Sequence, residues 1–216
     1  MQHQNVIVVA GGAPPHPAAR ELVPDGAAIV AADGGLDHAL ALGLHVDVAV
    51  GDFDSASDEA VARAAAAGTR IERHPEAKDA TDLELALDTA AALAPLRVVV
   101  LGALEGRLDH LLAALLSLGS PRYAAFELDA FFDLATIQVV RGERVLQGSL
   151  GELVSLLPVH GPAEGVTTEG LEYPLRGETL EPGSSRGVSN VFAAADARVT
   201  LGRGVLLAVR PGEGAE

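Results

Sequence analysis

The chain has 216 residues, no cysteine and a formal net charge of -15 at pH 7. Without cysteine it cannot form disulfides, bind metals through thiolates or use a cysteine nucleophile. Its negative charge argues against nucleic acid or an anionic membrane as the main partner, because both bind positive surfaces. Aromatic residues make up only 3% of the chain while the whole hydrophobic fraction is 49%, so we expect a folded, aliphatic core.

The first two thirds of the chain alternate between short β-branched runs and stretches rich in Ala and Leu. The runs at residues 5–10, 27–33, 46–52, 69–74 and 97–103 are typical of strands, and the segments between them fit helices. The clearest helix covers residues 107–118, where leucines repeat at helical spacing before Gly119 and Pro121. This alternation predicts a Rossmann-like α/β domain with a mostly parallel sheet.

The last third of the chain is different in character. Short strand-like runs at residues 135–147, 153–159, 165–175, 177–184 and 197–209 are joined by Gly, Pro and charged turns, with no convincing helix between them. We expect a small all-β antiparallel sandwich here. The predicted domains are therefore residues 1–134 and 135–216.

The start of the chain and its apolar runs indicate where in the cell we expect the protein. No basic segment precedes the first apolar run, so we expect no signal peptide. Charged residues or glycine interrupt every apolar run before it reaches the length that crosses a membrane. We expect a cytoplasmic protein without a membrane partner.

Polar clusters follow four of the predicted strands. They are Asp33, Gly34 and Gly35; Asp52, Asp54 and Ser55; Lys78, Asp79, Thr81 and Asp82; and Gly102, Arg107, Asp109 and His110. Ligands of open α/β sheets bind beyond the carboxyl ends of the strands, and a parallel sheet brings these ends to one edge. Carboxylates that converge there repel one another unless a cation is bound or one of them is protonated, and carboxylate oxygens suit Mg²⁺. The sequence therefore predicts a magnesium site.

Each cluster also has a purely structural explanation. The Asp33 segment fits an ordinary turn, and Asp54 with Ser55 fits a helix cap. Thr81 and Glu84 have the spacing of a capping box. The cluster around Arg107 fits the solvated first turn of a helix. It is the conjunction of all four clusters that favours a binding site.

Two cations could hold phosphate oxygens in this acidic chain. Lys78 is the only lysine, and Arg107 follows another strand, although a single lysine is also compatible with an ordinary surface position. The chain has no G-x-x-x-x-G-K-[ST] motif and no G-x-G-x-x-G after its first strand, so phosphates must be held differently. H-E-x-x-H and G-x-S-x-G are absent as well, which argues against zinc and serine hydrolases.

Four segments together resemble the thiamine pyrophosphokinase family. They are ADGGLDHALALGLHVDVAVGDFDS, KDATDLELAL, GALEGRLDHLLAALLSL and GVTTEGLEYPLRGETLEPGSSRGVSNVF, which occur in the family's order and approximate spacing. The resemblance implies an enzyme that transfers diphosphate from ATP to the hydroxyethyl group of thiamine, giving thiamine diphosphate and AMP. It also implies an ATP- and magnesium-binding α/β domain, a thiamine-binding β-sandwich, and a homodimer with thiamine at the subunit interface.

The resemblance assigns roles to particular residues. The expected catalytic residues are Asp52, Asp54, Asp82 and Arg107, of which the three aspartates hold Mg²⁺. The expected ATP-binding residues are Asp33, Gly34, Gly35, Lys78, Gly102, Arg107, Asp109 and His110. The expected thiamine-binding residues are Thr81, Asp82, Tyr173, Ser189 and Asn190.

Some features leave alternatives open. Glu105 stands where the family commonly has glycine and adds negative charge near the expected triphosphate. Tyr173 fits either a stacking platform for thiamine or ordinary packing in the sandwich, and His110 fits either a ligand contact or a neighbour of the helix cap. The alternative functions are a pyrophosphokinase for another alcohol such as a hydroxymethylpterin, a glycosyltransferase using DFD as its D-x-D metal motif, and a sensor of thiamine or nucleotide without turnover.

Overall fold

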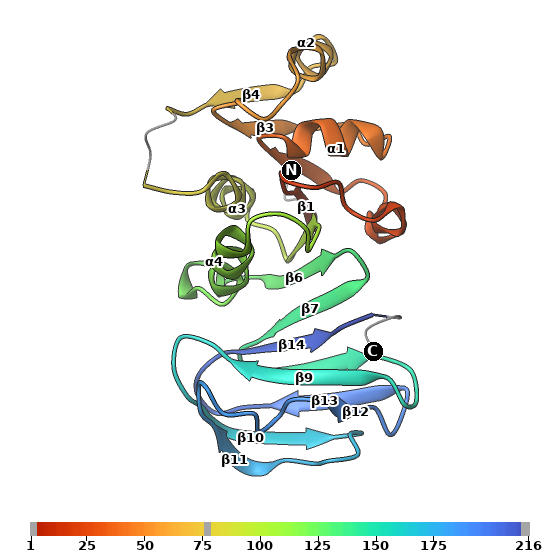
Figure 1. Ribbon diagram of the computed structural model, residues 1–216, viewed down its shortest axis with the longest axis vertical. Coiled ribbons are helices and arrows are strands. Elements are labelled where there is room, and N and C mark those ends of the chain that lie inside the picture. Colours follow the sequence, from red (N-terminus) through yellow and green to blue (C-terminus); the bar gives the residue numbers. More distant parts are fainter. Residues whose placement is uncertain (1–3, 76–78, 213–216) are drawn as a thin grey trace. The chain divides into compact units, whose positions relative to one another are not determined.

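The structure, a computed structural model, describes residues 4–75 and 79–212 (Figure 1). The chain divides into two compact units. One comprises Met1–Ala114 with Ala125–Asp133, and the other comprises Leu115–Ala124 with Leu134–Glu216. The order of an α/β unit followed by an all-β unit confirms the predicted fold class.

A parallel sheet forms the centre of the first unit. Its strands, in spatial order, are β6 (Glu127–Phe132), β5 (Arg97–Gly102), β1 (Asn5–Val9), β2 (Ala28–Ala32), β3 (Val48–Gly51) and β4 (Arg70–Arg73). The five strands predicted from the β-branched runs are all present. Strand β6 was not predicted, because its sequence ELDAFF includes the charged Asp129, which is buried and paired with Arg97 at 2.6 Å.

Helices cover both faces of this sheet. They are η1 (Pro17–Leu22), α1 (Gly35–Ala41), α2 (Asp58–Ala66) and α3 (Asp82–Ala92). Helix α4 (Leu108–Leu118) follows β5 and is divided between the two units after Ala114. Figure 1 shows α1 and α2 on one face and α3 on the other. After β4 the chain returns to place β5 on the far side of β1, so the direction of winding reverses between β1 and β5. Among the described residues, no helix is both long enough and apolar enough to cross a bilayer.

Two antiparallel sheets form the second unit, as predicted. One has the order β12 (Asn190–Val191), β9 (Leu153–Pro158), β14 (Leu206–Arg210) and β7 (Ala135–Val140). The other has the order β11 (Arg176–Leu180), β10 (Ala163–Glu169), β13 (Asp196–Thr200) and β8 (Glu143–Gln147). A short 3-10 helix, η2 (Pro121–Tyr123), also belongs to this unit. Buried aliphatic side chains and Phe192 from both sheets form the hydrophobic core of this unit.

The run predicted as one strand over residues 165–175 is interrupted in the structure. Strand β10 ends at Glu169, and residues 171–175 form a loop before β11. Gly170 has a φ of +77°, and a Cβ added there would lie 2.2 Å from the carbonyl oxygen of Asp196. The chain therefore turns where only glycine fits, and this turn places Tyr173 in a loop instead of a strand.

Candidate functional site

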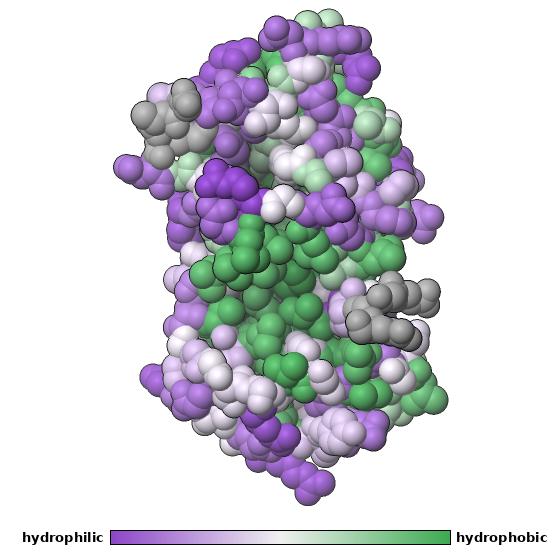
Figure 2. Space-filling view, in the orientation of Figure 1, coloured by the Kyte–Doolittle hydropathy of each residue, from purple (hydrophilic) through white to green (hydrophobic). Residues whose placement is uncertain are grey.

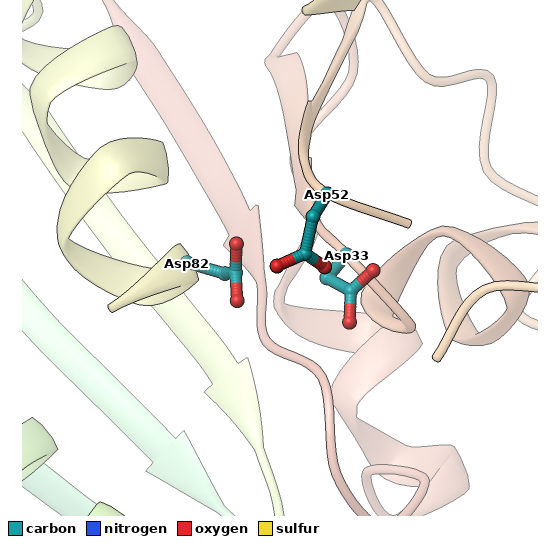
Figure 3. Close-up of side chains that lie close together, drawn as sticks. All are labelled: Asp33, Asp52 and Asp82. Atoms are coloured by element: carbon teal, nitrogen blue, oxygen red, sulfur yellow. The ribbon is translucent and has the colours of Figure 1, made fainter. Parts of the chain in front are cut away.

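Three aspartates converge at the carboxyl edge of the parallel sheet. Asp33 directly follows β2, Asp52 directly follows β3, and Asp82 begins α3. Each offers one carboxylate oxygen, and these oxygens lie within 4.8 Å of one another. Figure 3 shows the three side chains directed into the same small space. The predicted convergence of strand-end carboxylates is thus present in the structure.

Backbone geometry brings these carboxylates close together. A Cβ on Gly51 would lie 3.0 Å from the Cβ of Asp33 and 3.1 Å from Oδ1 of Asp82. Asp33 itself has a φ of 47°, and Phe53 has a φ of 63°. Left-handed backbone is uncommon for residues other than glycine and often marks a functional site. Here it occurs on both strand ends that carry the aspartates.

The electrostatics of the cluster favour a bound cation. Asp33 is only 7% exposed, and its Oδ1 has no hydrogen-bond partner among the described residues. Burial raises the pKa of Asp33, and the nearby carboxylates of Asp82 and Asp54 act in the same direction. A hard divalent cation such as Mg²⁺ takes oxygen ligands and would offset both the repulsion and the missing partner. The residues present therefore fit a magnesium ion.

The predicted metal ligands overlap only partly with this cluster. Asp54 lies outside the group formed by Asp33, Asp52 and Asp82. It is exposed, its Oδ1 accepts a hydrogen bond from the Ser55 hydroxyl at 2.9 Å, and its N–H faces Oδ1 of Asp52 at 3.3 Å. Asp33, which the resemblance placed in the ATP site, occupies the third position. The role of Asp54 as a metal ligand stays a prediction.

Arg73, at the end of β4, contributes a cation beside this loop. Its guanidinium carbon lies 4.9 Å from the centre of the Phe53 ring, and its Nη1 is 3.5 Å from the carbonyl oxygen of Asp52. The Phe53 ring is itself buried in the core of the first unit. Sequence reasoning missed Arg73, because nothing in the spacing of the motifs indicates that it stacks on this ring. Its position at a strand end was the one available signal.

The glycines of the predicted ATP site have packing roles in the structure. A Cβ on Gly35 would lie 2.2 Å from the carbonyl oxygen of Val9, so α1 approaches the end of β1 too closely for any other residue. A Cβ on Gly34 would lie 3.3 Å from the carbonyl oxygen of Ser55. A Cβ on Gly102 would lie 2.7 Å from a ring carbon of Phe132. The fold therefore requires glycine at positions 35 and 102 whatever ligand binds there, whereas at position 34 a Cβ would only be tightly packed.

The predicted phosphate-binding group near α4 is exposed to solvent. Nη2 of Arg107 lies 2.6 Å from Oδ2 of Asp109, and both side chains are exposed, as is His110. Hydrogen bonding to Arg107 lowers the pKa of Asp109 to about 2. Arg107 is thus paired in the structure, and a phosphate would have to compete with Asp109 for it.

The segment at the start of α3 contains the predicted capping box of Thr81 and Glu84. The Thr81 hydroxyl accepts a hydrogen bond from Glu84 N–H at 3.2 Å, while Thr81 N–H donates to Oε2 of Glu84 at 3.1 Å. This confirms the capping box, which fixes the first turn of α3 and hence Asp82. Lys78 lies outside the described residues.

The predicted thiamine-binding residues of the β-sandwich lie beside one another. A cavity of about 380 Å³ is lined by Tyr173, Asn190 and the segment 184–188. Ser189 connects this segment to Asn190 and, like Asp33, has a left-handed backbone, with a φ of 56°. The other predicted thiamine-binding residues, Thr81 and Asp82, belong to the first unit.

Comparisons of the sequence and of the structure with known proteins both find thiamine pyrophosphokinases. Residues 19–128 match the family model described as thiamin pyrophosphokinase, catalytic domain, and residues 136–206 match the model of its vitamin B1 binding domain. Thiamine pyrophosphokinase of Bacillus subtilis (strain 168) is 27% identical over 164 residues, which cover 75% of this chain and 77% of the relative.

Two solved structures cover nearly the whole chain. The crystal structure of thiamine pyrophosphokinase from Bacillus subtilis has a TM-score of 0.85 at 25% identity, covering 97% of this chain and 99% of that one. The corresponding protein from Geobacillus thermodenitrificans has a TM-score of 0.82 at 26% identity, covering 98% and 99%.

Proposed function

The chain belongs to the thiamin pyrophosphokinase family and is a diphosphotransferase enzyme. We propose that it transfers diphosphate from ATP to thiamine at the cluster of Asp33, Asp52 and Asp82. In the proposed reaction the hydroxyl oxygen of thiamine attacks the β-phosphorus of ATP. The bond between this phosphorus and the oxygen of the α-phosphate breaks, AMP leaves, and the hydroxyl proton is released. The products are thiamine diphosphate and AMP.

The observation that carries the proposal is the convergence of three carboxylate oxygens within 4.8 Å at the edge of the sheet. In the absence of a cation such a cluster is destabilised by repulsion. Mg²⁺ bound here would neutralise the charge on the transferred diphosphate and align it for in-line attack. Asp33, Asp52 and Asp82 would hold the ion, and Asp54, at the rim of the same loop, is a further candidate ligand.

Basic side chains would contribute to binding ATP. We assign Arg107 to the phosphates, because it is exposed and held at the start of α4 by Asp109. A guanidinium forms two parallel hydrogen bonds to phosphate oxygens, so it can replace the carboxylate of Asp109 with a phosphate group. Lys78 remains a second proposed phosphate contact, and His110 a proposed neighbour of the nucleotide.

Thiamine is proposed to contact Tyr173 and Ser189 in the sandwich. Tyr173 is 53% exposed, which leaves its ring available for stacking against a heteroaromatic cation. The negative charge of the chain favours this cation over a neutral alcohol.

We also propose a homodimer with thiamine bound between the subunits, as the family resemblance implies. Leu104, Leu108 and Leu112 are 46%, 68% and 52% exposed. Figure 2 shows a hydrophobic area on one face of the molecule, and exposed leucines of this kind favour a protein–protein interface. Light scattering coupled to size-exclusion chromatography tests this: twice the chain mass supports the dimer, and the mass of one chain at micromolar concentration contradicts it.

Product analysis tests the proposed function. Purified protein is incubated with ATP, Mg²⁺ and thiamine, and the products are separated by chromatography. We expect AMP and thiamine diphosphate in equal amounts, none without thiamine or Mg²⁺, and a loss of roughly a hundredfold or more in Asp52→Asn. Asp196→Asn, an exposed aspartate of β13, is the control and should remain active. Diphosphorylation of a hydroxymethylpterin but not of thiamine would reject the proposed substrate, and binding without turnover would indicate a sensor.

A further inference from the structure

A buried asparagine binds the backbone of Tyr173, whose side chain is exposed. Asn190 is 3% exposed. Its Oδ1 accepts hydrogen bonds from the N–H groups of Tyr173 at 3.0 Å and Val191 at 2.9 Å, and its Nδ2 donates to the carbonyl oxygen of Tyr173 at 2.8 Å. Both backbone polar groups of Tyr173 are therefore bound by one side chain. The amide oxygen already accepts two hydrogen bonds, which is its usual capacity.

A serine on the neighbouring strand holds Ser189. The left-handed backbone of Ser189 is unfavourable for a residue with a side chain and persists only where surrounding contacts impose it. Its N–H donates to the hydroxyl oxygen of Ser155, in β9, at 3.0 Å. The next residue of β9, Leu156, donates its N–H to the carbonyl oxygen of Gly187 at 2.8 Å. Two adjacent residues of β9 thus fix the loop that carries Ser189.

These contacts meet at the cavity of about 380 Å³, which Tyr173 and Asn190 both line. The one cation among the residues lining this cavity, Arg186, is engaged by Glu178 through two hydrogen bonds of 2.9 Å. An anionic ligand would have to displace this carboxylate, whereas a cationic heteroaromatic ligand would not. The charge distribution therefore agrees with the thiamine assignment.

We infer that Asn190 and Ser155 are positioning residues for the alcohol substrate: Asn190 acts through Tyr173, and Ser155 acts through Ser189. The inference rests on the proposed function, because it takes Tyr173 and Ser189 as the thiamine contacts. It changes the role of Asn190 from a direct contact to a support for the aromatic ring, and it gives Ser155 a role in substrate binding.

Kinetic variants test this inference in the full-length protein. Asn190→Ala and Ser155→Ala should each raise the KM for thiamine by roughly tenfold while the KM for ATP stays within about twofold, because misplacing a binding group weakens only the interactions it makes. Ser155→Thr keeps the hydroxyl acceptor and should restore the wild-type KM.

Thr69→Val is the matched control for lost stability. The Thr69 hydroxyl is buried in the first unit and donates to the carbonyl oxygen of Val46 at 2.7 Å. This variant should lower the melting temperature without changing the KM for thiamine. If Asn190→Ala and Ser155→Ala behave like Thr69→Val, their roles are only structural and the inference is wrong.

A double-mutant cycle separates positioning from direct contact. If Asn190 acts through Tyr173, Asn190→Ala should have little further effect on the thiamine KM in a Tyr173→Ala background, because coupled residues are not additive. An equal effect in both backgrounds would show that Asn190 contacts the substrate itself and would overturn its assignment as a positioning residue.

Tyrosine emission provides a binding measurement that does not depend on turnover. The chain has two tyrosines and no tryptophan, and Tyr123 is 1% exposed. Thiamine should change the emission of the wild-type protein, and Tyr173→Phe should abolish that change. Binding without product would contradict the proposed function alone. Product formation with unchanged thiamine affinity in both alanine variants would contradict this inference alone, and absence of thiamine binding would overturn both.

Discussion

Replacing Asp33 by asparagine should stabilise the metal-free protein while removing its response to Mg²⁺. Asparagine has the same shape as aspartate and tolerates the left-handed backbone found at this position, with a φ of 47°. The selected carboxylate oxygens lie within 4.8 Å of one another, and two unit charges at that limit repel by roughly 3.5 kcal/mol at an effective dielectric constant of 20. Because each charge is shared by two oxygens and the site is partly solvated, we expect a net gain of about 1–2 kcal/mol.

The assay is thermal unfolding followed by far-UV circular dichroism, with and without Mg²⁺. A gain of this size in a chain of 216 residues corresponds to a rise in melting temperature of roughly 2–8 °C without metal. Mg²⁺ should raise the melting temperature of the wild type, because a ligand of the native state stabilises it. It should have a much smaller effect on Asp33→Asn.

The pH dependence gives a second test of the same reasoning. The pKa of Asp33 is raised in the folded protein, so its ionised form costs stability at neutral pH. This cost disappears as the pH falls through the raised pKa, and the difference between Asp33→Asn and the wild type should shrink accordingly. A metal-free variant that is less stable than the wild type at pH 7, with its Mg²⁺ response intact, would refute the account of the cluster. Asp196→Asn should change neither quantity.

Three further predictions concern residues around the site. Arg73→Met removes the cation stacked on the Phe53 ring. It should lower the free energy of unfolding by about 0.5–1 kcal/mol and raise the KM for the magnesium complex of ATP, whereas Arg73→Lys keeps a cation and should show smaller changes in both. An unchanged KM would show that Arg73 does not support the loop. Glu84→Ala removes the Glu84 half of the capping box with Thr81, and should cost about 0.5–1.5 kcal/mol of unfolding free energy. It should also weaken Mg²⁺ binding measured by calorimetry, and an unaltered affinity would argue against this role of the helix start. The carboxyl ¹³C signal of Asp109 should titrate with a midpoint near its pKa of about 2. In Arg107→Met this midpoint should move to higher pH, because Arg107 stabilises the ionised carboxylate and this stabilisation is lost only as the pH falls toward the pKa. An unshifted midpoint would contradict the pairing.

The fold could be predicted largely because the two halves of the chain differ in periodicity. Buried parallel strands appear as short β-branched runs, and the sandwich appears as short strands separated by Gly and Pro turns. Strand β6 escaped detection because it carries Asp129, whose charge is compensated by Arg97 from the neighbouring strand. Compensation of this kind depends on a partner 32 residues away and leaves no local pattern.

The site could be predicted to the level of the sheet edge but not to the level of individual ligands. Strand ends specified where the carboxylates gather, whereas the direction of each side chain depends on the turn that follows. The left-handed Phe53 directs the chain so that Asp52 joins the cluster and Asp54 lies outside it. The role of Arg73 depends on the same turn, since it stacks on the ring that this turn places.

The most direct test of the proposed reaction is a ³¹P NMR time course of the protein with ATP, Mg²⁺ and thiamine. Attack at the β-phosphorus predicts that the signals of AMP and thiamine diphosphate rise at equal rates while those of ATP fall, and that Asp82→Asn shows neither. Formation of ADP with thiamine monophosphate, or full activity in Asp82→Asn, would contradict diphosphate transfer at the Asp33, Asp52 and Asp82 cluster.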